Sequence, residues 1–215
     1  MPIDKVWVIA EIAGGSPVST SLELLTKARS MASATEAVSW GTEVSKAAGE
    51  LGNFGATTVH DVGDIDDALP GVPVAAAMAG LVRAGNGPDV ILVPTTYDGR
   101  DIAGRLSAML DVPVITNVVG LEVEGDEVRS EHAIFGGTKV AKARFTGDRP
   151  WIFVVRAKSF AAEPSGGAAP EVVPANVPGD LGATNAAKVL ARHVEEQSGP
   201  KLDEADVVVS GGRGL

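Results

Sequence analysis

The chain has 215 residues, of which 45% are hydrophobic and 21% charged, the proportions of an ordinary globular protein. Its 28 acidic and 18 basic residues give a formal net charge of −10, which argues against a nucleic-acid partner, because binding to a phosphate backbone needs a basic surface. It contains no cysteine, which excludes disulfides and cysteine-ligated metal sites. We find neither a signal-peptide core nor an apolar run of the roughly 20 residues that a membrane span needs, so we expect a cytoplasmic protein that is not membrane-embedded.

Short apolar runs alternate with helical patterns through the first half of the chain. The runs expected to form strands cover 6–10, 37–40, 56–59, 89–93 and 112–115. The segments expected to form helices cover about 20–32, 43–51, 73–84 and 100–110. Continuous apolar strands that alternate with helices are typical of a parallel sheet covered on both faces. We therefore predict an α/β fold with three layers, a Rossmann-like parallel sheet between two layers of helices.

The hydrophobic pattern changes to period two beyond residue 120. The four segments expected to form strands here cover 121–124, 127–131, 138–145 and 151–155. Gly125 and Asp126 predict a two-residue hairpin turn between the first two strands, and Gly136 and Gly137 predict another turn. The parallel sheet is therefore expected to be followed by an antiparallel meander of about four strands.

The last third of the chain has a different composition. Residues 156–182 are rich in Ala, Pro, Gly and Glu, which predicts extended chain that wraps the domain or links onward. A helix is expected over about 185–196, and Gly199 and Pro200 mark an expected domain boundary. We therefore predict one domain over residues 1–200 and the start of a second domain over 201–215, with the rest of that domain absent.

Ligands of open parallel sheets bind at the carboxyl ends of the strands. The residues expected there are Glu11, Gly14, Ser16, Trp40, His60, Thr95, Thr96 and Asn117. Thr95, Thr96 and Asp98 could hold a phosphate at the start of the next helix, but we favour the interpretation that they cap it. Thr20 and Glu23 have the spacing of a capping box for the first helix.

The usual sequence signatures of catalysis and nucleotide binding are missing. The three histidines, which are His60, His132 and His193, lie far apart and lack metal-ligand spacing. Ser210 lacks the glycine that a nucleophile elbow requires two residues before it. Neither a Walker A sequence nor a G-x-G-x-x-G sequence follows a predicted strand. With no nucleophile, metal cluster or acid–base pair, the residues do not favour an enzyme.

Arg213 lies among glycines directly after an apolar run at 207–209, which we interpret as a buried strand. Gly211, Gly212 and Gly214 permit positive φ and close approach of a ligand, and the guanidinium supplies a permanent, forked positive charge. We interpret Arg213, Gly211 and Gly212 as a cofactor-binding turn. The alternative is a tight turn whose arginine pairs with an acidic residue elsewhere.

Residues 202–215, with Ser-Gly-Gly-Arg-Gly near their end, resemble the start of the FAD-binding domain of the electron transfer flavoprotein α subunits. The other stretches that resemble this family cover 22–28, 98–108, 111–114, 135–142 and 155–160. The resemblance therefore extends over nearly the whole chain. Its specific part is the Ser-Gly-Gly-Arg-Gly motif.

The resemblance implies a sheet of the adenine nucleotide α hydrolase type, as in universal stress proteins. It also implies a heterodimer with a β subunit, which carries electrons on FAD from flavoprotein dehydrogenases, such as the acyl-CoA dehydrogenases of fatty acid β-oxidation, to a membrane quinone oxidoreductase. Of the family's flavin-site residues, only Arg213 and its flanking glycines Gly211 and Gly212 map onto this chain. We therefore expect FAD in the full-length heterodimer and not on this chain by itself.

Beside a flavin, Arg213 would favour the negative charge that reduction adds. One charge-assisted hydrogen bond contributes about 1.5–3 kcal/mol, which corresponds to roughly 65–130 mV for one electron. Without partner strands, residues 206–215 are expected to pair onto a neighbouring molecule or to be poorly ordered. The alternative function is a stand-alone nucleotide-binding module of the universal-stress type that uses residues 14–16 with Thr95 and Thr96, and it leaves 207–215 unexplained.

Overall fold

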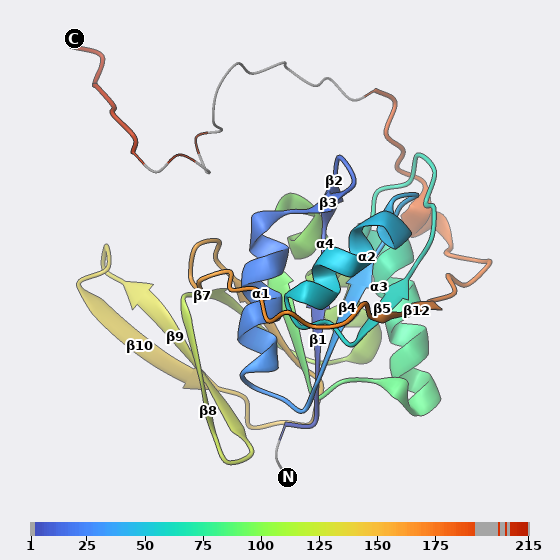
Figure 1. The fold of residues 1–215 in the computed structure, drawn as a ribbon, viewed down its shortest axis with the longest axis horizontal. Helices are drawn as coiled ribbons and strands as arrows, with labels where there is room; N and C mark the ends of the chain where they lie inside the picture. Colours follow the sequence, from blue (N-terminus) through green and yellow to red (C-terminus); the bar gives the residue numbers. More distant parts are fainter. Residues whose placement is uncertain (1–2, 192–201, 203–204, 206, 215) are drawn as a thin grey trace.

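Seven parallel strands form the central sheet of the computed structural model, which describes residues 3–191, 202, 205 and 207–214. These strands are β1 (Lys5–Ile9), β4 (Ala34–Ser39), β5 (Thr58–Asp61), β6 (Val90–Pro94), β7 (Val114–Val118), β11 (Trp151–Val155) and β12 (Glu171–Pro174). Their order is β12-β5-β4-β1-β6-β11-β7, and each neighbouring pair is parallel. Helices lie on both sides of the sheet (Figure 1). The predicted three-layer α/β fold is confirmed.

Four helices supply the two outer layers. They are α1 (Ser19–Arg29), α2 (Val44–Asn53), α3 (Gly71–Leu81) and α4 (Tyr97–Leu110), and a short π-helical turn, η1 (Val82–Asn86), follows α3. Leu25 and Leu51 of α1 and α2 belong to the same buried cluster as Val8 of β1. Met78 of α3 belongs to a second cluster with Trp7. Because successive side chains of a strand point to opposite faces, each face of the sheet has its own core.

A second, antiparallel sheet lies beside the first (Figure 1). It consists of β8 (Gly120–Glu124), β9 (Glu127–Ile134) and β10 (Lys139–Arg144) in the order β10-β9-β8, and a two-stranded hairpin, β2 (Ile12–Ala13) with β3 (Ser16–Pro17), follows β1. Gly125 has φ +66°, and Gly136 and Gly137 have φ +66° and +88°. Both predicted turns are therefore confirmed at the ends of β9.

The prediction of a fourth meander strand is wrong. β11 lies inside the parallel sheet, where Phe153 pairs with Leu92 of β6 on one side and with Ile115 of β7 on the other. All of its residues after Trp151 are buried. The apolar run identified a strand, but strand pairing depends on distant neighbours that local periodicity does not contain.

Residues 156–182 cross over the helices of one layer and then add the edge strand β12 (Figure 1). The Ser165 N–H and Oγ–H both donate to the carbonyl oxygen of Asn53, at 2.6 and 2.9 Å. A Cβ at Gly52 would lie only 2.4 Å from the carbonyl oxygen of Ala168, so this crossing requires glycine. The predicted wrapping is confirmed, whereas β12 escaped prediction because its apolar run is only two residues long, Val172 and Val173, in a Pro/Gly/Ala-rich stretch.

The start of the first helix also differs from the prediction. α1 begins after Val18 without a side-chain cap, so the capping box of Thr20 and Glu23 is absent. The carboxylate of Glu23 instead accepts the backbone N–H of Lys158, at 2.8 Å. Lys158 has φ +60° and lies in the turn after β11. A long-range contact has therefore taken the side chain that sequence spacing assigned to a local cap.

The described part of the predicted C-terminal helix, residues 185–191, does not form an α-helix. Ala183–Asn185 form only a single 3-10 turn, and residues 186–191 are not helical. Val207, Val208 and Val209 are exposed and form no strand with any residue that the structure describes. Residues 192–196 of the predicted helix, the predicted boundary at Gly199 and Pro200, and the two ends of 206–215 lie outside the described residues.

Candidate functional site

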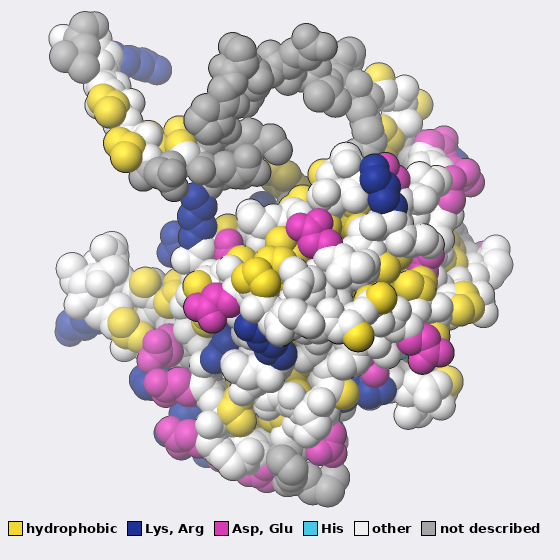
Figure 2. Space-filling model, in the orientation of Figure 1, with side chains coloured by type: hydrophobic (Ala, Val, Ile, Leu, Met, Phe, Trp, Pro, Cys, Tyr) yellow, Lys and Arg dark blue, Asp and Glu magenta, His cyan; other side chains and the backbone are white. Residues whose placement is uncertain are grey.

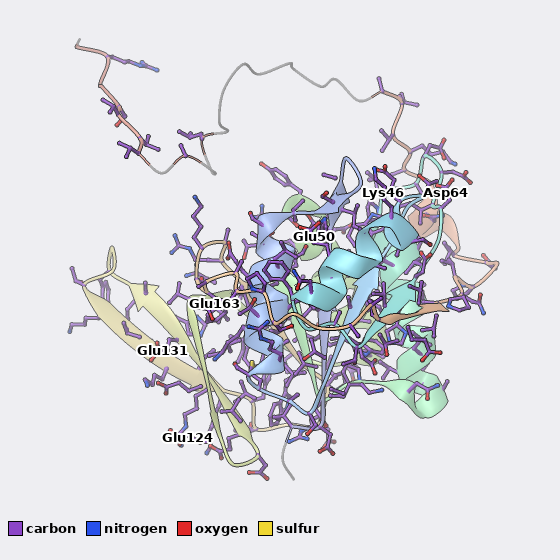
Figure 3. The ribbon with its side chains drawn as sticks, viewed as in Figure 1. Lys46, Glu50, Asp64, Glu124, Glu131 and Glu163 are labelled. Atoms are coloured by element: carbon purple, nitrogen blue, oxygen red, sulfur yellow. The ribbon has the colours of Figure 1, made fainter. Side chains whose placement is uncertain are left out.

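A cavity of about 550 Å³ opens at the carboxyl ends of β1, β4 and β5, where ligands of parallel sheets bind. Five carboxylate residues contribute to its lining: Glu11, Glu43, Asp64, Asp66 and Asp98. Trp40 also lines it, as the sequence suggested for this edge of the sheet. Lys46, which does not line the cavity, is ion-paired with Glu43 at 3.6 Å (Lys46 and the cavity residue Asp64 are labelled in Figure 3). None of the described lysines or arginines lines the cavity.

Glu11 and Thr96 connect this cavity to the start of α4. The Thr96 hydroxyl donates to the Glu11 carboxylate, and it accepts the backbone N–H of Gly99 at 2.9 Å. Burial raises the pKa of the Glu11 carboxyl, the hydrogen bond from Thr96 opposes that rise, and the negative charge of Asp98 adds to it. Capping of α4 is thus confirmed, although the capping residue is Thr96 and not Asp98. The Thr95 hydroxyl donates to the carbonyl oxygen of Val155 at 2.7 Å.

The charge of this cavity is unsuited to a phosphate. A phosphate placed there would face several carboxylates in a partly desolvated site, where like charges repel more strongly than in water. The two threonines that could have held it are already engaged in the contacts above. The stand-alone nucleotide-binding module is therefore not favoured.

His60 belongs to a buried polar cluster on the sheet and does not line the cavity. Glu36 of β4 accepts the Nε1–H of Trp7 and the Nε2–H of His60, each at 2.7 Å, and Lys5 Nζ lies 3.2 Å from its other oxygen. Burial alone would raise the pKa of Glu36, but the hydrogen bonds from His60 and Trp7 and the charge of Lys5 outweigh it and lower this pKa to about 2. The cluster links β1, β4 and β5 through side chains, so we interpret its role as stabilisation of the sheet and not as ligand binding.

The other residues expected at the carboxyl edge have structural contacts as well. Gly14, with φ +60°, lies in the turn of the β2–β3 hairpin, and Ser16 of β3 pairs with Ala13 of β2. Asn117, with φ +59°, faces His132, whose Nδ1 lies 3.2 Å from the Asn117 carbonyl oxygen. On its other side, His132 Nε2 lies 2.9 Å from Ser130 Oγ. This contact joins β9 to the end of β7, and His193 lies outside the described residues.

Arg213, Gly211 and Gly212 are exposed. Arg213 forms neither a hydrogen bond nor an ion pair with any residue that the structure describes. Among these residues, the alternative that Arg213 pairs with an acidic side chain is therefore not supported. A Cβ at Gly212 would meet no atom within 4 Å. An exposed guanidinium can donate two parallel hydrogen bonds to an anionic group, such as the pyrophosphate of FAD, so the chemistry of these residues is compatible with a flavin cofactor. Cofactor binding by the three remains a prediction.

The sequence analysis did not identify the acidic lining of the cavity or the buried carboxylate of Glu36. Glu43, Asp64 and Asp66 lie in polar loops after β4 and β5, and the signal for them was that acidic residues follow two neighbouring strands. The signal for Glu36 was a single carboxylate inside an otherwise apolar strand, where charge is rare without partners. Among the described residues, no helix has the length and apolarity to cross a bilayer, and no group of three potential metal ligands converges.

Comparison with known proteins places the chain in a family. Residues 6–180 match the model of the electron transfer flavoprotein domain. Proteins named electron transfer flavoprotein subunit alpha are 34% identical in Mycobacterium leprae (strain TN), 35% in Mycobacterium tuberculosis (strain H37Rv) and 30% in Syntrophomonas wolfei. The alignments cover 98%, 98% and 97% of this chain but only 65% of each relative, so the chain spans just under two thirds of their length. This chain belongs to the electron transfer flavoprotein family.

Proposed function

We propose that this chain acts as the α subunit of a heterodimeric electron transfer flavoprotein, with a β subunit as its partner and FAD as its cofactor. The observation that carries the proposal is the alignment with α subunits over 98% of the chain. The rigid three-layer body, whose polar residues at the sheet edge are engaged with one another, suits a platform for a partner better than a small-molecule site.

The proposed role is electron carriage and not catalysis of a substrate's conversion. Electrons would come from flavoprotein dehydrogenases such as acyl-CoA dehydrogenases and pass to a membrane-bound quinone oxidoreductase, with the carrier itself in the cytoplasm. When bound, FAD supplies the reversible uptake of electrons. The described Ser130 and His132 resemble half of a catalytic triad, but Ser130 is completely buried, so no substrate can reach its hydroxyl.

In this role Arg213 would bind FAD and hold a fixed positive charge beside it. Gly211 and Gly212 would let the backbone approach the cofactor, because they add no side chain between the two. The guanidinium would stabilise added negative charge whether it contacts the ring system or the pyrophosphate. These assignments rest on the exposure of Arg213 and on the resemblance of Ser-Gly-Gly-Arg-Gly to the start of the family's FAD-binding domain.

Co-expression of the chain with the β subunit of the same organism tests the proposal. We expect a heterodimer of defined mass that carries stoichiometric FAD and shows the visible absorbance of a flavin. A colourless protein that stays monomeric and binds ATP or AMP would contradict the proposal and support the nucleotide-binding module.

Replacement of the arginine tests the cofactor assignment within the same complex. Arg213→Ala should weaken FAD binding or lower the flavin potential by roughly 65–130 mV, because one charge-assisted hydrogen bond is lost. Arg213→Lys keeps the charge without the fork and should show a smaller change. Unchanged affinity and potential in Arg213→Ala would remove Arg213 from the site.

A further inference from the structure

The turn between β9 and β10 has an unusual backbone. Phe135, Gly136 and Gly137 have φ +50°, +66° and +88°, so three consecutive residues lie in the left-handed region. Left-handed φ is uncommon for residues other than glycine and is a clear outlier for a bulky side chain. The turn is held by Gly137 N–H to the Ile134 carbonyl oxygen at 3.1 Å and by Thr138 Oγ–H to the Phe135 carbonyl oxygen at 2.9 Å.

This backbone holds the Phe135 ring in solvent, where the ring is 74% exposed. Val140 and Ile134 beside it are exposed to 58% and 36%. We call Ile134, Phe135 and Val140 the hairpin-tip patch. The turn lies at the far end of the three-stranded sheet, away from the parallel sheet (Figure 1). By contrast, Phe145 packs against the rings of Trp151 and Phe153, so apolar surface nearer the body is covered.

The charges of the three-stranded sheet are almost all satisfied within it. Seven charged side chains of β8, β9 and β10 form ion pairs with one another: Glu122, Glu124, Glu127, Arg129, Glu131, Lys142 and Arg144. Figure 2 shows acidic and basic side chains side by side on this sheet, and Figure 3 labels Glu124 and Glu131 there. Lys139, which follows the turn, is the exception on these strands, since it has no ion pair with any described residue.

We propose that the hairpin-tip patch and Lys139 dock the second subunit of the heterodimer, which presents an apolar recess with a carboxylate at its rim. Backbone strain persists where the surrounding structure imposes it, and it concentrates at functional positions such as ligand clamps. An exposed aromatic ring fixed in one place is also the kind of residue that anchors interfaces. This inference depends on the heterodimer proposed above.

Two other occupants fit the patch less well. A second copy of the chain in a two-fold contact would bring the same patch on each copy together, which places one Lys139 close to the other. A membrane surface would require a cluster of basic residues, whereas Lys139 is the one basic residue of these three strands without an ion pair to a described residue. The patch is smaller than the roughly 800 Å² per partner of a stable interface, so it serves as the anchor of a larger contact.

The test measures the affinity of the chain for the β subunit after Phe135→Gly. Glycine accepts φ +50° without strain, so this variant should fold at least as well as the unsubstituted chain while it loses the ring. We expect the Kd to rise at least about tenfold. Lys139→Glu should raise it less, mainly through slower and more salt-dependent association. Tyr97→Ala is the matched control, because its ring is 88% exposed on α4, and its Kd should stay within about twofold.

Equal affinities of Phe135→Gly and the unsubstituted chain would overturn this inference and leave the heterodimer intact. Absence of binding by the unsubstituted chain would overturn the heterodimer itself and this inference with it. Self-association of the chain that disappears in Phe135→Gly, or binding of the unsubstituted chain to anionic vesicles that disappears in Phe135→Gly, would assign the patch to a different occupant and so contradict the proposal.

Discussion

The two sheets of this protein are stabilised in different ways. The seven-stranded sheet is covered on both faces, and its central strands β1, β6 and β11 are almost completely buried. The three-stranded sheet buries side chains such as Leu121 and Val128 and carries paired charges elsewhere, with an exposed apolar tip at one end. The first therefore provides the stability of the fold, and the second provides surface that is available to a partner.

Removal of a side chain from the buried sheet should have the largest effect. Phe153→Ala, in β11, should lower the free energy of unfolding by about 3–5 kcal/mol, because it leaves a cavity in the completely buried cluster on one face of the sheet. Val140→Ala on the exposed edge of β10 should change it by less than about 0.5 kcal/mol. Urea unfolding of both variants measures the difference. Similar losses in the two would contradict the division between the sheets.

The parallel sheet was predictable to a large extent because burial on both faces leaves a local signal. The continuous apolar run at 89–93 predicted β6 within one residue. The position of β11 was not predictable in this way, because the same kind of run fits a meander strand and a central parallel strand equally well. β12 was missed for the opposite reason, since an edge strand with Val172 exposed needs no long apolar run.

The candidate site was predictable only in part. The sequence indicated that α4 is capped, and of the predicted residues Thr96 is the cap. Its hydroxyl also donates to Glu11, which follows β1, and this long-range contact left no local signal. His60 of β5 was expected at the ligand edge, and it instead contacts Glu36 on the neighbouring strand β4. Contacts of this kind depend on register between strands, which spacing within one segment does not reveal.

Glu36 provides the second test, because it is a charge inside the apolar sheet. Glu36→Gln removes the negative charge that His60, Trp7 and Lys5 surround, and it should lower the free energy of unfolding by roughly 2–3 kcal/mol near pH 7. Urea unfolding at several pH values measures this loss. An equally stable Glu36→Gln variant would mean that the cluster contributes nothing beyond packing.

The pH dependence of this loss has a definite sign. Folding lowers the pKa of Glu36 from 4.5 to about 2, so the folded state binds the ionised form more favourably than the unfolded chain does. The stabilisation is therefore fully present above about pH 5 and is lost as the pH falls through 4.5 towards 2. The stability difference between the unsubstituted chain and Glu36→Gln should shrink over that range. A difference that stays constant would contradict the assigned pKa.

The smallest effect is expected in the three-stranded sheet. Lys142→Gln removes ion pairs to Glu122 at 2.8 Å and to Glu131 at 3.0 Å, both of which are exposed to solvent and screened. It should cause a small loss of thermal stability that disappears in concentrated salt, as expected for surface charges. A loss that persists in salt would contradict this, because it would show that Lys142 stabilises the sheet by packing and not through its ion pairs.

We have proposed that the chain carries electrons as part of a flavin-containing heterodimer. The most direct test is to mix the purified complex anaerobically with a flavoprotein acyl-CoA dehydrogenase and its acyl-CoA substrate, and to follow the flavin absorbance of the complex. We expect catalytic amounts of dehydrogenase to bleach the flavin and a quinone oxidoreductase to restore its absorbance. A complex that holds no flavin, or whose flavin stays oxidised with every dehydrogenase of the organism, would contradict the proposal.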